Sequence, residues 1–268
     1  MNQQKCYLTS GILLLFLLMV ACKSSVSTDS EKAAGGHANS GSMTTSSAGT
    51  ACANAYYPAS PTLQKTYKAT YTGGKLPNST YTESYTNFTR DGFVQKMQFA
   101  PMEAKSGKTD IISIEHGFRC GAEGLMALEY ANVNAGQENM FKFKTVKTDG
   151  ISFPNEGDWK VGKKWQANFE VEGLPSEGKG IPMMLKDGKF TLDYEIVAAE
   201  KLTVAAGSYD TFKVLMVVTS KMNLGMQGKA MPMNLPPFKN FVWFAKDVGM
   251  VKSETIGMAT TELIELKK

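Results

Sequence analysis

The chain has 268 residues, of which 43% are hydrophobic and 20% charged, so it is long and apolar enough to bury a core and is not disordered throughout. Its 29 basic and 25 acidic residues leave a formal charge of +4 without a basic cluster, which argues against nucleic-acid binding. Only two histidines occur, and this excludes most histidine-based metal and acid–base chemistry.

Residues 1–21 are predicted to be a signal peptide. Lys5 precedes a nine-residue apolar run, 12–20, which is too short to span a bilayer as a mature helix. The sequence Leu18-Met19-Val20-Ala21-Cys22 resembles the lipobox of bacterial lipoproteins, in which the cysteine sulfur receives a diacylglycerol group and becomes the new N-terminus. The resemblance implies that Cys22 carries acyl chains, such as palmitate, that anchor the protein to a membrane. The alternative is a plain signal peptide that is cleaved elsewhere.

The residue after Cys22 indicates which membrane carries the anchor. Lys23 stands where an aspartate would resemble an inner-membrane retention signal. We therefore expect a lipid anchor in the bacterial cell envelope, in the outer membrane if the cell has one.

Residues 22–55 are predicted to form a lipidated, flexible tether. Serine, threonine, glycine and alanine dominate this segment, and such a composition cannot bury enough apolar surface to fold. His37 lies in it and is expected to be solvated. Residues 56–268 are predicted to form a single β domain.

From Tyr56 onward, apolar residues recur with a period of two, which indicates β-strands. The ranges 67–71, 165–171 and 190–196 each alternate apolar with polar residues. Turn sequences such as Asp247-Val248-Gly249 separate the strands and are typical of hairpins. We predict an all-β fold: a large curved antiparallel sheet or incomplete barrel with meander topology, roughly ten to twelve strands and few or no long helices after the signal peptide.

Two stretches break the alternation. Residues 212–218 (FKVLMVV) and 241–245 (FVWFA) are apolar on both faces. Strands of this kind are covered on both faces, so both are predicted to be central strands of the sheet.

Three stretches carry a resemblance to a known family. They are Gly150-Ile-Ser-Phe-Pro154 with Trp159 to Trp165, then 204–214 (VAAGSYDTFKV), then 242–254 (VWFAKDVGMVKSE). The last two resemble the motifs AGxxDxFKV and WFAxxVGxVKxE of secreted bacterial β-proteins that are classified as domains of unknown function. The range 120–124 (CGAEG) is similar to a cysteine-plus-glycine turn of that family. The resemblance implies a curved sheet similar to lipoprotein-carrier folds, and it implies no reaction.

The cysteines favour one disulfide. Cys6 leaves with the signal peptide and Cys22 is predicted to be lipidated, so Cys52 and Cys120 remain as an even pair in an oxidising compartment. We predict that they form a disulfide. The alternative is two free thiols.

The titratable residues give no strong sign of catalysis. His116 lies four residues from Cys120 on one predicted strand, about 13 Å away, so the two cannot form a thiolate–imidazole pair. It is expected to be a polar strand residue beside Glu115. The same-face pairs Glu170 with Glu172 and Asp193 with Glu195 are expected to be solvated on the wet side of the sheet. We predict no enzyme activity and no cofactor or metal.

Methionine is the one compositional excess, with 16 residues. Two clusters stand out: Met183 with Met184, and Met222, Met226, Met231 and Met233. Thioethers suit Cu(I), but methionine also supplies adaptable apolar surface, and it can simply fill a core. We favour an apolar lip, with Met183, Met184, Met226, Met231 and Met233 as candidate ligand-binding residues. Because glycines and prolines interrupt residues 222–238, this segment is expected to be a loop between two central strands.

These observations favour a membrane-anchored envelope lipoprotein that is a non-enzymatic binding or scaffold module. Its expected partners are the membrane, through the lipid on Cys22, and a hydrophobic or lipidic ligand or an envelope protein. Two alternatives stay open: an envelope hydrolase whose carboxylates cannot be placed, and a Met-rich copper-handling protein.

Overall fold

The computed structural model describes residues 54–73, 78–99, 112–130, 132–134, 143–173, 184–226 and 229–268. All of them belong to the compact unit Thr50–Lys268. They form 14 strands and the short 3₁₀ helix η3 (Glu156–Asp158). The strands are β1 (Gln64–Tyr71), β2 (Ser79–Thr86), β3 (Gly92–Phe99), β4 (Ile112–Gly121), β5 (Gly124–Ala127), β6 (Asn132–Asn134), β7 (Phe143–Gly150), β8 (Phe153–Pro154), β9 (Lys164–Gly173), β10 (Met184–Val204), β11 (Gly207–Met226), β12 (Lys229–Ala245), β13 (Gly249–Thr255) and β14 (Ala259–Lys267).

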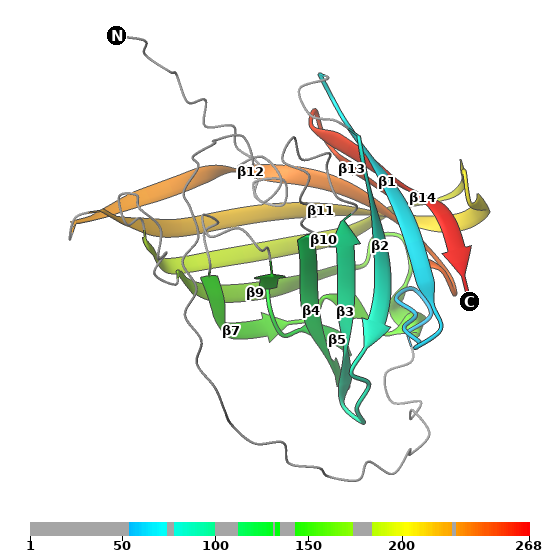
Figure 1. The fold of residues 1–268 in the computed structure, drawn as a ribbon, viewed down its shortest axis with the longest axis horizontal. Coiled ribbons are helices and arrows are strands. Elements are labelled where there is room, and N and C mark those ends of the chain that lie inside the picture. The colour runs from blue at the N-terminus through cyan, green and yellow to red at the C-terminus, as the bar shows by residue number, and fades with distance from the viewer. Residues whose placement is uncertain are drawn as a thin grey trace, which may run out of the picture. The chain divides into compact units, whose positions relative to one another are not determined.

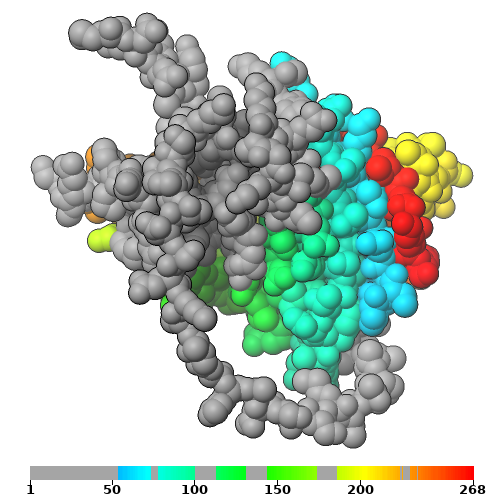
Figure 2. All heavy atoms as spheres, in the orientation of Figure 1, coloured from blue at the N-terminus to red at the C-terminus, as the bar shows by residue number. Residues whose placement is uncertain are grey.

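All strands belong to one open, curved antiparallel sheet (Figure 1). Their order is β7-β9-β10-β11-β12-β13-β14-β1-β2-β3-β4-β5-β8, and β6 pairs with β4 beside this path. The C-terminal strand β14 pairs with β1, so the two halves of the chain join there, and their side chains form one continuous surface (Figure 2). The predicted all-β class is therefore confirmed. The strand number exceeds the expected one because β5, β6 and β8 have only two to four residues, too few for an alternating pattern.

Alternation decides which side of each strand is buried. On β1 the side chains of Tyr67 and Ala69 are 0% and 6% exposed, and on β9 those of Phe169 and Val171 are 3% and 1% exposed. We call the side of the sheet that carries these residues the inner face. Each large apolar side chain buried there contributes about 1.5–3 kcal/mol.

The stretches 212–218 and 241–245 lie in central strands, as predicted. β11 pairs with β10 and β12, and β12 continues into a pairing with β13. Trp243 lies on the outer face yet is only 5% exposed. The Lys213 and Lys252 ammonium groups lie 4.8 and 5.5 Å from its ring centre. Charged side chains with long apolar stems therefore surround this ring.

The prediction of a loop over residues 222–238 is wrong. β11 runs to Met226 and β12 starts at Lys229, and the two strands pair along this whole stretch apart from a bulge. Pro236 and Pro237 fall in that bulge, where the register shifts between Val218 and Ser220. β13 pairs with β12 only from Asn240 onward, so the prolines lie at a sheet edge, where a missing N–H costs no ladder hydrogen bond.

The residues before β1 enter the interior. We call Asn54–Ser60 the entry segment. The Asn54 side-chain amide donates to the Pro154 carbonyl at 2.9 Å, and the Asp247 N–H donates to the Ala55 carbonyl at 2.6 Å. The Tyr57 ring stacks on Phe153 with 4.0 Å between ring centres. The entry segment thus connects β8 with the β12–β13 turn. Among the described residues, no helix is long and apolar enough to cross a membrane.

Candidate functional site

The two methionine clusters, which lie about 40 residues apart in the sequence, meet on neighbouring strands. Met184 of β10 pairs with Gly225 of β11, and Met222 of β11 pairs with Met233 of β12. β9 pairs with β10 only as far as Gly188, so the start of β10, the end of β11 and the start of β12 continue beyond it (Figure 1). We call this three-stranded extension, residues 184–188, 220–226 and 229–235, the arm.

The predicted ligand-binding methionines differ in what the structure shows of them. Met183 lies outside the described residues, and Met184 and Met226 are placed by their backbones alone. The Met231 side chain is 48% exposed, and that of Met233 is half-buried. Met231 and Met233 are two residues apart on β12, so they share a face of the arm.

That face is the continuation of the inner face. Met233 pairs with Met222, which is 8% exposed, and Met222 is followed inward along β11 by residues of the same alternation phase. We call this set the methionine stripe: Met216, Val218, Ser220 and Met222 of β11 with Met231 and Met233 of β12. The four residues of β11 are all less than 10% exposed. The stripe therefore runs from the open surface of the arm into the interior.

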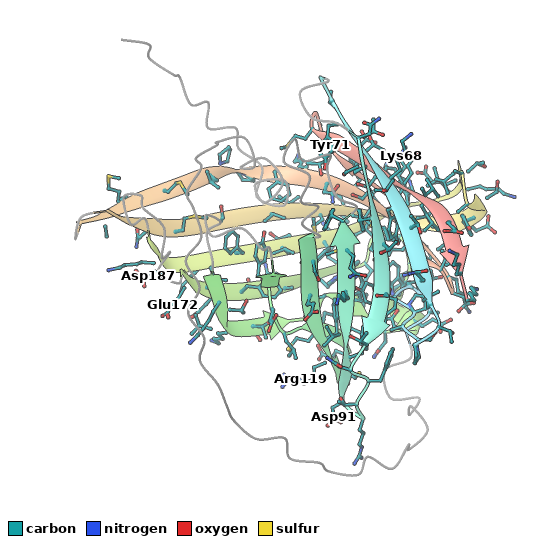
Figure 3. The ribbon with its side chains drawn as sticks, viewed as in Figure 1. Lys68, Tyr71, Asp91, Arg119, Glu172 and Asp187 are labelled. Carbon is teal, nitrogen blue, oxygen red and sulfur yellow. The ribbon has the colours of Figure 1, made fainter. Side chains whose placement is uncertain are left out.

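The reverse face of the arm is polar. The side chain of Lys221 is exposed, and the Asn223 amide donates to the Asp187 carboxylate at 3.2 Å. Figure 3 labels Asp187 at this part of the molecule. Lys221, Asn223 and Asp187 therefore make this face polar, although the register places Met184 and Pro232, the partners of Gly225 and Asn223, on the same face.

Aromatic rings line the inner face next to the stripe. Tyr130 stacks on Phe190 at 4.3 Å between ring centres, and Trp165 stacks on Tyr194 at 5.1 Å. Burial raises the pKa of Tyr130 and of Tyr194 well above that of free tyrosine. Both phenols are therefore neutral at physiological pH, and the wall carries no charge there.

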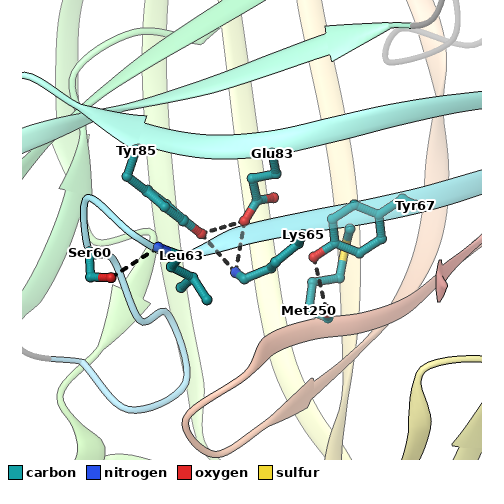
Figure 4. A network of polar contacts seen from close by, with 7 residues as sticks. All are labelled: Ser60, Leu63, Lys65, Tyr67, Glu83, Tyr85 and Met250. Atoms are coloured by element: carbon teal, nitrogen blue, oxygen red, sulfur yellow. Dashed lines mark hydrogen bonds and ion pairs between the residues drawn. The ribbon is translucent and has the colours of Figure 1, made fainter. Parts of the chain in front are cut away.

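A buried ion pair lies on the inner face of β1 and β2 (Figure 4). The Lys65 ammonium is 2.8 Å from the Glu83 carboxylate and donates to the Tyr85 hydroxyl at 2.7 Å. The Tyr85 hydroxyl in turn donates to the same carboxylate oxygen. Lys65 and Glu83 are 1% and 3% exposed. This closed triangle neutralises its own charge, because each buried ion has its partner.

Burial and the Glu83 charge act together on the surrounding phenols. They raise the pKa of Tyr85, Tyr67 and Tyr57 well above the ordinary value. Sequence reasoning missed this triangle, although a signal existed. Lys65 has the same odd parity as Tyr67 and Ala69, so the alternation that placed these residues inside also places the lysine there.

His116 lies on β4 opposite Gln95 of β3, which is 7% exposed. Burial lowers the pKa of His116 to about 4, against the smaller, opposite effect of Glu83. The imidazole is therefore neutral at physiological pH. This environment differs from the expected polar position beside Glu115.

The carboxylate pairs considered from the sequence lie on the wet face. Glu170 and Glu195 form ion pairs with Lys189 at 3.6 Å and Lys164 at 3.3 Å. Asp193 accepts a hydrogen bond from Gln166 at 2.7 Å. Within the described ranges, no group of three or more His, Cys, Asp or Glu side chains could hold a metal ion.

The structure describes only one of the two cysteines of the predicted disulfide. Cys120 lies on β4 and is disulfide-bonded. Cys52 and Cys22 lie outside the described residues, so the pairing of Cys52 with Cys120 and the lipidation of Cys22 stay predictions.

The chain belongs to the DUF3108-like family, whose model matches residues 74–258. A structure described as an exported protein with a YmcC-like fold, from Bacteroides fragilis, is 16% identical over 81% of this chain and 100% of its own, with a TM-score of 0.43. A second, described as a lipoprotein from Parabacteroides distasonis, is 15% identical over 80% of this chain and 99% of its own, with a TM-score of 0.41. No curated protein matches the chain.

Proposed function

We propose that this member of the DUF3108-like family is a lipid-anchored envelope protein whose β domain binds a hydrophobic or lipidic ligand on the methionine stripe. In this proposal residues 1–21 are the signal peptide, Cys22 carries the anchor, and the tether runs from Cys22 to the entry segment. The membrane is the outer membrane if the cell has one. The domain binds its ligand without a reaction.

One observation carries the binding proposal: the side chains of one face, apolar except for Ser220, pass from the surface into the core. Met231 is 48% exposed, whereas Met222 and Val218, further along the same face, are 8% and 2% exposed. A half-exposed methionine leaves apolar surface in contact with water, and a ligand can cover that surface. The flexible methionine side chain also adapts to ligands of different shape. The reverse face of the arm, in contrast, carries the polar side chains of Lys221, Asn223 and Asp187.

The experiment measures uptake of an environment-sensitive hydrophobic dye by the purified chain. The test variant is the double substitution Met231→Ser and Met233→Ser, which leaves the buried Met222 in place. We expect the dye affinity to fall at least fivefold and the melting temperature to change by only a few degrees, because Met231 and Met233 are not fully buried.

The matched control is Lys221→Ser on the reverse face of the arm, which should leave dye uptake unchanged. Unaltered uptake in the stable double variant would contradict the proposal. A fall in the melting temperature of ten degrees or more would instead assign these methionines to the core.

A further inference from the structure

Asn240 is a buried amide on the inner face, at the inner end of the methionine stripe. It is 4% exposed and pairs with Met216 of the stripe on one side and with Thr255 of β13 on the other. It shares its alternation phase on β12 with Val242 and Phe244, which pack in a buried cluster with Trp159 and Trp165. Its side chain therefore lies on the same face as the stripe.

The Asn240 side-chain oxygen has no hydrogen-bond partner among the described residues. Buried acceptors nearly always have a partner, since an unpaired carbonyl oxygen loses its water without compensation. This oxygen is therefore an acceptor without a donor among the described residues, and it lies beside Met216, between the methionine stripe and the buried pair of Val214 and Val242.

The charged residues of the inner face indicate whether the head group that carries this donor is charged. Among the described residues, the buried charged side chains are Lys65 and Glu83, and they neutralise each other at 2.8 Å. The His116 imidazole is neutral at physiological pH. Among the residues that the structure describes, an ionised carboxylate or phosphate would find no unpaired buried cation, and burying it would be unfavourable. An uncharged head group avoids this cost.

Distance along the strands fits a long chain. Met216, the partner of Asn240, and Met222 are six positions apart on β11. At about 3.3 Å per residue this is roughly 20 Å, comparable with an extended long-chain alkyl group. A chain whose polar end lies at Asn240 thus has the length to reach the arm.

We propose that the ligand is an uncharged single-chain lipid with a terminal hydroxyl group, which donates its proton to the Asn240 side-chain oxygen while the alkyl chain lies along the methionine stripe. This inference rests on the proposed function, and it adds the polarity of the head group and the orientation of the ligand.

The experiment compares three probes of equal chain length as competitors for the hydrophobic dye on the full chain: hexadecanol, hexadecyl methyl ether and palmitate. The ether lacks the donor, and palmitate is ionised at neutral pH. We expect hexadecanol to bind about five- to tenfold more tightly than the ether, which corresponds to one hydrogen bond in a dry site. It should also bind more tightly than palmitate, because burying an unpaired carboxylate is unfavourable.

Asn240→Leu should abolish the preference for hexadecanol over the ether, because the variant has no acceptor for the hydroxyl group. The matched control, Asn223→Leu, makes the same chemical change on the reverse face of the arm and should keep the preference. The wild-type preference can be measured without any variant, so a failure of Asn240→Leu to fold leaves the test intact.

Two negative outcomes are distinguishable. If the wild type binds all three probes equally, or if Asn240→Leu retains the preference, the inference about Asn240 is wrong and the proposed function stands. If none of the probes competes and the dye does not bind, the proposed function itself is wrong.

Discussion

Lys65 and Glu83 form an ion pair of 2.8 Å in which both side chains are almost fully buried, at 1% and 3% exposed. The pair joins β1 to β2, directly opposite each other in the register. Gly249 lies against it from the β12–β13 turn, where a Cβ atom would come within 2.9 Å of the Lys65 nitrogen. The ion pair is therefore enclosed by β1, β2 and the β12–β13 turn.

Removing one partner of this pair should be strongly destabilising. Lys65→Met leaves the Glu83 carboxylate buried without its cation, and we expect a loss of about 3–5 kcal/mol of unfolding free energy in urea titrations. Lys65→Met combined with Glu83→Gln should recover at least half of the loss, because the charge is gone. The exposed pair Lys164 and Glu195 is the control, where Lys164→Met should cost less than about 1 kcal/mol. Equal effects at both pairs would contradict this account.

Stability should fall in acid through His116. The folded-state pKa is lowered to about 4 from the unfolded value of 6.5, so the unfolded chain binds more protons between these values. This contribution is fully present above pH 6.5 and is lost as the pH falls towards 4. We expect His116→Gln to flatten the dependence of unfolding free energy on pH in this window, by about 1–3 kcal/mol across it. An unchanged slope in the variant would show that other groups titrate there.

The predicted disulfide has a direct test. If Cys52 pairs with Cys120, non-reducing peptide mapping of the folded protein should give one cross-linked peptide that contains both residues. The loop closed would have about 69 residues, so Cys120→Ser should lower stability by roughly 4 kcal/mol. Cys52→Ser serves as the matched variant and should have the same effect. A cross-link from Cys120 to another cysteine would contradict the pairing.

Lipidation of Cys22 should decide where the protein fractionates. Wild-type protein is expected in the membrane fraction with incorporated labelled palmitate, because two or three acyl chains make anchoring effectively stable. Cys22→Ser should lose the label and leave the membrane fraction. Cys6→Ser is the control, since this residue is predicted to leave with the signal peptide. Membrane association of an unlabelled Cys22→Ser protein would show a different anchor.

Much of the fold follows from alternation alone. The parity of Tyr67 and Ala69, or of Phe169 and Val171, predicts which side of a strand is buried, and the structure agrees. The arm could not be predicted in this way, because Pro232, Pro236 and Pro237 are typical of loops. Their tolerance depends on β12 being an edge there, and an edge is a property of strand order that a local pattern does not contain.

The candidate site was predictable only in part. An apolar lip was expected from the methionines. Its continuity with the core depends on the pairing of Met222 of β11 with Met233 of β12, and the local sequence pattern does not contain this pairing. Asn240 gave no signal, because an asparagine between Lys239 and Phe241 is ordinary for a strand. Only its burial and its unpaired oxygen distinguish it.

The entry segment has a mechanical consequence. Tension on the backbone ahead of Asn54 passes first into the hydrogen bonds of Asn54 with Pro154 and of Asp247 with Ala55, which lie on different parts of the sheet. These bonds and the stacked Tyr57 ring must yield before β1 can be peeled from β14 and β2. A pull from the N-terminal side therefore loads the contacts of the entry segment before it loads β1, the strand that carries Lys65.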